Sequence, residues 1–186
     1  MDVQIRSDHP LHRLFAELVE RHLVQSAGID DIEAARYIAA LLVDFTHTDG
    51  LYRVRDAAGK RLDGVGEMLI ESNPLLNGRS FFYEREVRKH IGDFTLFMAG
   101  LFPEHLARLP KRGFTVDAMV DYMRAGKESY GVVAAFDQFE FKSVAPLFRR
   151  LSSKFELCVF GLNQATQELQ RNQRAWYGSV RQALEI

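Results

Sequence analysis

The sequence predicts an all-α protein, with six to eight helices packed as one globule and a short β-hairpin inserted around residues 51–63. Apolar residues recur at helical spacing along most of the chain. Phenylalanine is abundant, with 14 copies that can fill a large core, whereas only 5 prolines interrupt the helices. A length of 186 residues fits one domain, so residues 1–186 are expected to form a single helical domain.

The first half of the chain contains recognisable helix-boundary residues. Asp8 is a predicted N-cap, and Gly28 is expected to end the helix that follows it. Asp30 opens a second helix, which has a wide apolar surface and ends at Gly50. The helices that these and similar signals predict along the whole chain cover residues 9–26, 30–49, 65–72, 80–101, 115–136, 141–152, 154–170 and 175–184.

The segment between the second and third helices has a different pattern. Residues 51–55 alternate between apolar and polar, residues 56–59 have the composition of a turn, and residues 60–62 return toward the start. This pattern predicts the β-hairpin. The segment also carries a local basic patch, which consists of Arg53, Arg55, Lys60 and Arg61.

The second half continues the helical pattern. Ser80 is the predicted N-cap of a long helix that Pro103 stops, and Thr115 is the predicted N-cap of the next one. Pro146 is expected to bend the helix that contains it. Because helices 30–49 and 80–101 have the widest apolar surfaces, we expect them to form the centre of the molecule.

Composition restricts the classes of function. The net charge of −1 argues against a nucleic-acid partner, because such proteins carry a strong basic surface. The single cysteine, Cys158, allows neither an internal disulfide nor a cysteine-based zinc site. The apolar run at residues 94–102 is much shorter than the roughly 20 residues of a membrane helix, and the first residues lack an apolar signal core. These features predict a cytoplasmic protein without a membrane partner.

One polar cluster is a candidate metal site. Glu86, His90 and Asp93 fall within about 60° of one another around the axis of their helix. A histidine flanked by carboxylates can ligate a metal ion or act as an acid–base group. The alternative is a network at the edge of the core without chemistry, and the lack of the ExxH spacing of di-iron proteins favours this alternative.

Histidines also suggest a cofactor site. His22 shares the inward face of the first helix with Phe15 and Leu18. If the first and long helices pack together, His22 and His90 could bind a haem-like cofactor, whereas the alternative is an ordinary core histidine. Asp44 and His47 could add to a metal site, or form a solvated helix end.

The C-terminal segment contains residue types that are enriched at protein interfaces. They are Arg171, Arg174, Trp176 and Tyr177. The segment is therefore either a surface for a protein partner or for self-association, or a terminal helix that docks its Trp onto the domain.

Most of the chain from the second helix onward resembles a family of small helical bacterial proteins to which no activity is assigned. The resemblance lies in Ile91-Gly92-Asp93, Leu96-Phe97, Gly100-Leu101-Phe102-Pro103, Tyr122-Met123 and Tyr130. It implies an all-α fold and a structural role for the Gly92-Asp93 step. Independently, glycines within an apolar helix cost about 1 kcal/mol each relative to alanine, so Gly92 and Gly100 indicate close helix packing or the approach of a ligand.

These observations leave three classes of function. The favoured class is a non-enzymatic helical interaction or adaptor protein that associates with a protein partner or with itself. The second is a helical binder of a small apolar ligand or a haem-like cofactor. The third is a metal-dependent enzyme that uses the Glu86, His90 and Asp93 cluster. The sequence contains no complete catalytic signature, so it decides neither whether the protein is an enzyme nor which cofactor it uses.

Overall fold

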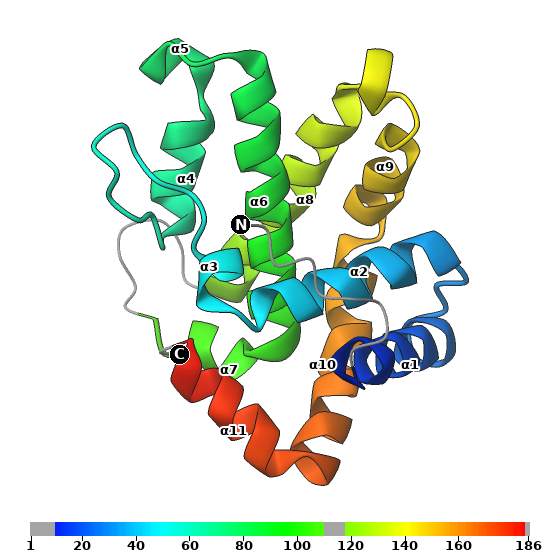
Figure 1. The fold of residues 1–186 in the computed structure, drawn as a ribbon. Helices are drawn as coiled ribbons and strands as arrows, with labels where there is room; N and C mark the ends of the chain where they lie inside the picture. Colours follow the sequence, from blue (N-terminus) through cyan, green and yellow to red (C-terminus); the bar gives the residue numbers. More distant parts are fainter. Residues whose placement is uncertain (1–9, 110–117, 185–186) are drawn as a thin grey trace.

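The computed structural model describes residues 10–109 and 118–184 (Figure 1). Within them, the chain forms eleven α-helices and no strand, so the all-α prediction is confirmed. The number of helices exceeds six to eight because the four-residue helices α3, α5 and α7 were not predicted. The elements are α1 (Pro10–Gln25), α2 (Ile32–Phe45), α3 (Thr48–Leu51), α4 (Val65–Ser72), α5 (Pro74–Asn77), α6 (Phe81–Leu101), α7 (Pro103–Leu106), α8 (Ala118–Ala135), the 3-10 turn η1 (Phe139–Phe141), α9 (Ala145–Ser153), α10 (Phe155–Asn172) and α11 (Arg174–Ala183).

The predicted β-hairpin at residues 51–63 is wrong. The chain does reverse there, but Arg55 and Arg61 form only an isolated bridge. Leu51 belongs to α3 and Tyr52 is its C-cap, which shortens the first arm. Val54 and Leu62 are buried, so packing against the core holds the reversal in place, together with hydrogen bonds from the Leu62 N–H to the Val54 carbonyl and from the Asp56 N–H to the Lys60 carbonyl (3.0 Å each).

Side-chain caps set several helix ends. Ser80 caps α6 as predicted, because its hydroxyl accepts the N–H of Tyr83. Asp31 rather than the predicted Asp30 caps α2, and its carboxylate accepts the N–H of Ala34. Pro146 lies in the first turn of α9, where its missing N–H costs nothing, so it does not bend a helix. The predicted caps Asp8 and Thr115 lie outside the described residues.

Helix α6 is the centre of the molecule. Every residue in 90–101 is buried, and α6 packs most extensively against α8 and then against α10 and α4. Helix α2 is also buried over much of its length, but it packs mainly against α1. Only one of the two predicted central helices therefore occupies the centre (Figure 1). Among the described residues, none of the helices combines the length and hydropathy needed to span a bilayer.

Two glycines let other elements approach α6 closely. A Cβ atom on Gly92 would clash with the ring of Tyr130 in α8. A Cβ atom on Gly100 would lie 2.7 Å from the Cβ of Leu162 in α10. The close packing that these glycines predicted is confirmed, and at Gly92 it presses the Tyr130 ring against the backbone of α6.

We predict that Gly92→Ala lowers the free energy of unfolding by about 2–3 kcal/mol, because the new methyl group displaces Tyr130 and overpacks the crossing. Gly178→Ala is the matched control, since its Cβ meets no atom within 4 Å and alanine favours the helix by up to about 1 kcal/mol. Urea denaturation of both variants measures the difference. Equal stabilities would show that the helices separate at no cost.

Candidate functional site

A pocket of about 600 Å³ lies beside the first half of α6. One wall consists of residues 53–57 and Gly59 in the reversal before α4, and the other consists of α6 residues between Tyr83 and Asp93. Arg79, which precedes α6, completes the lining. The pocket therefore contains His90, Asp93 and Glu86 of the predicted metal cluster, and Arg53 and Arg55 of the predicted basic patch.

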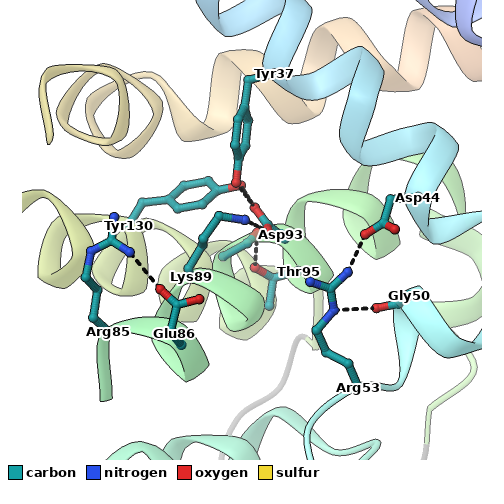
Figure 2. A network of polar contacts seen from close by, with 11 residues as sticks. Tyr37, Asp44, Gly50, Arg53, Arg85, Glu86, Lys89, Asp93, Thr95 and Tyr130 are labelled. Atoms are coloured by element: carbon teal, nitrogen blue, oxygen red, sulfur yellow. Dashed lines mark hydrogen bonds and ion pairs between the residues drawn. The ribbon is translucent and has the colours of Figure 1, made fainter. Parts of the chain in front are cut away.

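Asp93 is the most constrained charged group in the site. Only 4% of its surface is exposed. Its Oδ1 atom accepts hydrogen bonds from the Tyr37 hydroxyl at 2.5 Å and the Tyr130 hydroxyl at 2.8 Å. Its Oδ2 atom accepts one from the Lys89 ammonium at 2.7 Å. Figure 2 shows the two tyrosines entering from different helices, α2 and α8, and meeting at this carboxylate.

The surroundings of Asp93 keep the two tyrosines protonated. Burial, and after it the negative charge of Asp93, holds the pKa of Tyr37 and of Tyr130 well above the usual range. Both hydroxyls are therefore hydrogen-bond donors at neutral pH. Lys89 compensates the carboxylate charge from the pocket side, where its side chain is partly exposed. This arrangement holds the Asp93 carboxylate in place, and each of its two oxygens accepts at least one hydrogen bond.

His90 lies one helical turn before Asp93 on α6 and is also buried. Neither ring nitrogen makes a hydrogen bond within standard geometric limits, although the backbone of Leu51 lies close enough to favour the protonated ring slightly. Burial lowers the pKa of His90 to about 4 and outweighs the opposing effect of Asp93, while Arg53 and Lys89 lower it further. His90 is thus a neutral imidazole at pH 7, packed against the rings of Phe45 and Phe94.

The predicted metal cluster does not assemble. Glu86 is exposed and pairs with Arg85 at 2.7 Å, while Asp93 is held by Lys89 and the tyrosines. In the part of the chain that the structure describes, no group of three or more His, Cys, Asp or Glu side chains is arranged to hold a metal ion. Of the two further residues proposed, Asp44 pairs with Arg53, which also donates to the Gly50 carbonyl (Figure 2). The other, His47, lies 3.3 Å from the Thr46 hydroxyl.

The structure also gives His22 and His90 separate surroundings. The Nε2 atom of His22 lies 2.8 Å from the Glu168 carboxylate in α10, and its Nδ1 atom lies 3.2 Å from the Ser26 hydroxyl. His22 does not line the pocket, and its contacts include no neighbour of His90. The expectation that the two histidines share one cofactor is therefore unsupported by their positions.

The C-terminal residues divide between core and surface. Tyr177 is buried, stacks on Phe102 at 5.4 Å and donates to the Leu101 carbonyl at 2.7 Å. Trp176 is half-buried and meets Phe15 edge-on. Only Arg171 and Arg174 are fully at the surface. The contacts of α11 thus fit a terminal helix that docks onto the domain better than a surface for a partner. Arg171, Arg174 and part of Trp176 remain accessible.

Sequence reasoning did not identify the residues that hold Asp93. The i,i+4 spacing of Lys89 and Asp93 is a usable signal for a pair on one helix face. Tyr37 and Tyr130 lie 56 and 37 residues from Asp93 in the sequence, and no local pattern connects them with it.

We predict that Tyr37→Phe and Tyr130→Phe each lower the free energy of unfolding by about 1.5–3 kcal/mol, because each removes a hydrogen bond to a buried charge. Since both hydroxyls donate to the same oxygen, the double variant should not show the sum of the two effects. Tyr83→Phe, which removes a more exposed hydroxyl, should cost less. Urea unfolding gives all four values. If both single variants match the wild type, Lys89 alone satisfies Asp93.

We predict that His90 makes the fold less stable in acid. Its pKa of about 4 in the folded state lies below the usual 6.5. Between these values the unfolded chain binds a proton that the folded chain does not, so stability falls as the pH decreases from about 6.5 toward 4. The contribution of His90 between pH 7 and pH 4.5 is about 2–3 kcal/mol. Denaturation of His90→Leu at both pH values should show a decrease smaller by that amount.

His47→Gln, which removes an exposed histidine, is the control for His90→Leu and shows whether the loss of any one imidazole alters the pH dependence. Identical pH dependence in the wild type and His90→Leu would mean that the imidazole of His90 is protonated equally in both states.

Comparisons with protein-family models, with curated protein sequences and with solved structures give no match to this chain. The resemblance to small helical bacterial proteins therefore has no matching family model behind it. The function must be inferred from the surface and the pocket of this protein alone.

Proposed function

We propose that the protein is a non-enzymatic helical interaction protein that associates with a second copy of itself through an exposed apolar tip. The apolar tip consists of Leu75, Leu76, Phe81, Phe82 and Phe139. In Figure 1 these residues belong to α5, to the start of α6 and to the yellow segment before α9, which lie at the same end of the molecule.

The exposure of the apolar tip is the observation that carries this proposal. Leu75 and Phe139 are each 90% exposed, and Phe81 is 67% exposed. Scattered single apolar residues are normal on a protein surface, but a gathering of several large ones at one end marks an interaction site. Water around these side chains is released when a partner covers them, which favours association.

The backbone at Phe139 gives the proposal a second support. Phe139 has a φ of 51°, a left-handed conformation that no other non-glycine residue of the described chain adopts. Such a conformation costs on the order of 1–3 kcal/mol for a residue with a bulky side chain. The turn is fixed by Phe141, whose ring lies 5.8 Å from that of Phe82 and 3.9 Å from the Arg85 guanidinium. A strained turn that presents an aromatic ring to solvent fits a contact residue.

A second copy of the chain fits this surface in charge and in size. The net charge of −1 produces little repulsion between two copies. Glu140 and Lys142 have opposite charges and lie beside the apolar tip in the sequence. A twofold arrangement can bring Glu140 of one copy near Lys142 of the other. A stable dimer buries about 800 Å² on each partner, and one aromatic side chain supplies about 150–250 Å². Three exposed phenylalanines and two leucines approach that area.

We predict that the wild-type protein forms dimers at micromolar concentration and that the double variant Leu75→Ser/Phe139→Ser is a monomer, because it removes the two most exposed side chains of the apolar tip. Size-exclusion chromatography with light scattering measures the mass. Phe160→Ser, which removes an exposed phenylalanine of α10, is the matched control and should remain dimeric.

A wild-type protein that stays monomeric up to about 100 μM, against the micromolar dissociation constants typical of weak dimers, would overturn self-association. Point substitutions are preferable to removal of the C-terminal segment, because Tyr177, Val180 and Leu184 belong to the core.

The other two classes of function receive less support. A haem-like cofactor between His22 and His90, and a metal centre at Glu86, His90 and Asp93, both require side chains that face different partners in this fold. The cytoplasm fits a protein with one buried free cysteine, and the net charge gives no reason to expect a nucleic-acid partner.

A further inference from the structure

The pocket beside α6 shares no residue with the apolar tip and is large enough for a small molecule. Its volume of about 600 Å³ lies within the range of about 300–1,000 Å³ that is common for ligand pockets. None of the five residues of the apolar tip lines it. Its polar groups come from three parts of the chain, namely the segment 53–59, Arg79 and helix α6.

Cationic side chains outnumber acidic ones around the pocket. Arg53, Arg55, Arg79 and Lys89 face Asp56, Glu86 and Asp93. Each acidic group already has donors of its own. Asp56 accepts the N–H groups of Ala58 and Lys60, while Glu86 and Asp93 are engaged by Arg85 and Lys89. The charges of Glu86 and Asp93 are therefore compensated by cations, whereas the backbone donors leave the charge of Asp56 in place.

Arg55 is the cation that a ligand can use. Arg53 pairs with Asp44, Arg79 pairs with Glu71 at 2.9 Å, and Lys89 pairs with Asp93. In the described residues, by contrast, the Arg55 guanidinium donates only to the Gly59 carbonyl, at 3.1 Å. Its other N–H groups are available, and a guanidinium matches the two oxygens of a carboxylate or a phosphate.

The rest of the lining suits an organic group rather than a bare ion. Val54, Val87 and the Tyr83 ring provide apolar surface in the pocket. The His90 side chain is nine-tenths buried and lines the pocket, and neither of its nitrogens has a hydrogen-bond partner within standard geometric limits, although the backbone of Leu51 lies nearby. A neutral imidazole supplies one hydrogen-bond donor and one acceptor. A polar group of a ligand near α6 can therefore form a hydrogen bond with a ring nitrogen of His90.

We infer that this pocket binds a small organic anion, a molecule with one carboxylate or phosphate group attached to an apolar body. The oxyanion pairs with Arg55 at the wall formed by residues 53–59. The apolar body packs between Tyr83 and Val87, toward His90. A carboxylate and a phosphate can both pair with Arg55 in this way. Titrations with benzoate and with phenyl phosphate distinguish the two.

Isothermal titration calorimetry with benzoate, phenyl phosphate, inorganic phosphate and benzyl alcohol tests the inference. We expect saturable binding of at least one of the two aromatic anions and none of benzyl alcohol, because the alcohol lacks the charge. Stronger binding of phenyl phosphate assigns a phosphate ligand, and stronger binding of benzoate assigns a carboxylate ligand. Inorganic phosphate that binds as tightly as phenyl phosphate would overturn the role of the apolar wall.

Two variants locate the site. Arg55→Gln should weaken binding by at least about tenfold, since it removes a charge-assisted hydrogen bond. Ala57→Trp should abolish binding by filling the pocket from an exposed position that packing does not constrain. Arg171→Gln is the matched control, because it removes an exposed arginine far along the sequence and outside the pocket lining. Equal weakening by Arg55→Gln and Arg171→Gln would reveal non-specific attraction and would overturn the inference.

The result does not depend on self-association. The monomeric variant Leu75→Ser/Phe139→Ser carries an unchanged pocket and should bind the anion with wild-type affinity. Failure of the wild type to bind either aromatic anion overturns the pocket assignment alone, whereas a monomeric wild type that binds one of them overturns only the proposed dimer.

Discussion

The fold depends on one buried negative charge, the carboxylate of Asp93. Transfer of an unpaired carboxylate into a protein interior costs far more than the net stability of a domain, so its partners must be in place when the chain is folded. The partners come from α2, α6 and α8, and the network therefore fixes how these three helices are arranged around one point. Gly92 is part of this constraint, since the Tyr130 ring reaches Asp93 only by lying against a residue without a side chain.

The same constraint engages Asp93 and Lys89 of α6 with partners inside the protein. Asp93 directs one oxygen to two tyrosines and the other to Lys89, so protein donors occupy three of its roughly four acceptor positions. Lys89 and His90 remain at the pocket wall, one as a paired cation and the other as a neutral ring. A rigid wall with compensated charges is a good support for binding, because its groups need not rearrange when a ligand arrives.

Local sequence signals predicted the helices well and the site poorly. Helical spacing, the Ser80 cap and the glycines at 92 and 100 act within one element or at one crossing, and each was recognisable in the sequence. The hairpin was mispredicted because turn residues in the sequence do not reveal whether the segments on either side form strands. Here those segments form only one isolated bridge. The hydrogen bonds of Tyr37 and Tyr177 were missed, since their acceptors lie 56 and 76 residues away in the sequence and become neighbours only in the folded chain.

The apolar tip and the pocket both use the first turns of α6, yet they depend on different forces. Phe81 and Phe82 project from the first turn, while Tyr83 of the same turn and Glu86 of the next turn line the pocket. Association through apolar side chains is driven by the release of water and does not weaken when salt is added. The pairing of Arg55 with an anion weakens as ions screen its exposed charge. Salt therefore separates the two properties in one preparation, because a concentration that releases the anion leaves the contact between two copies intact.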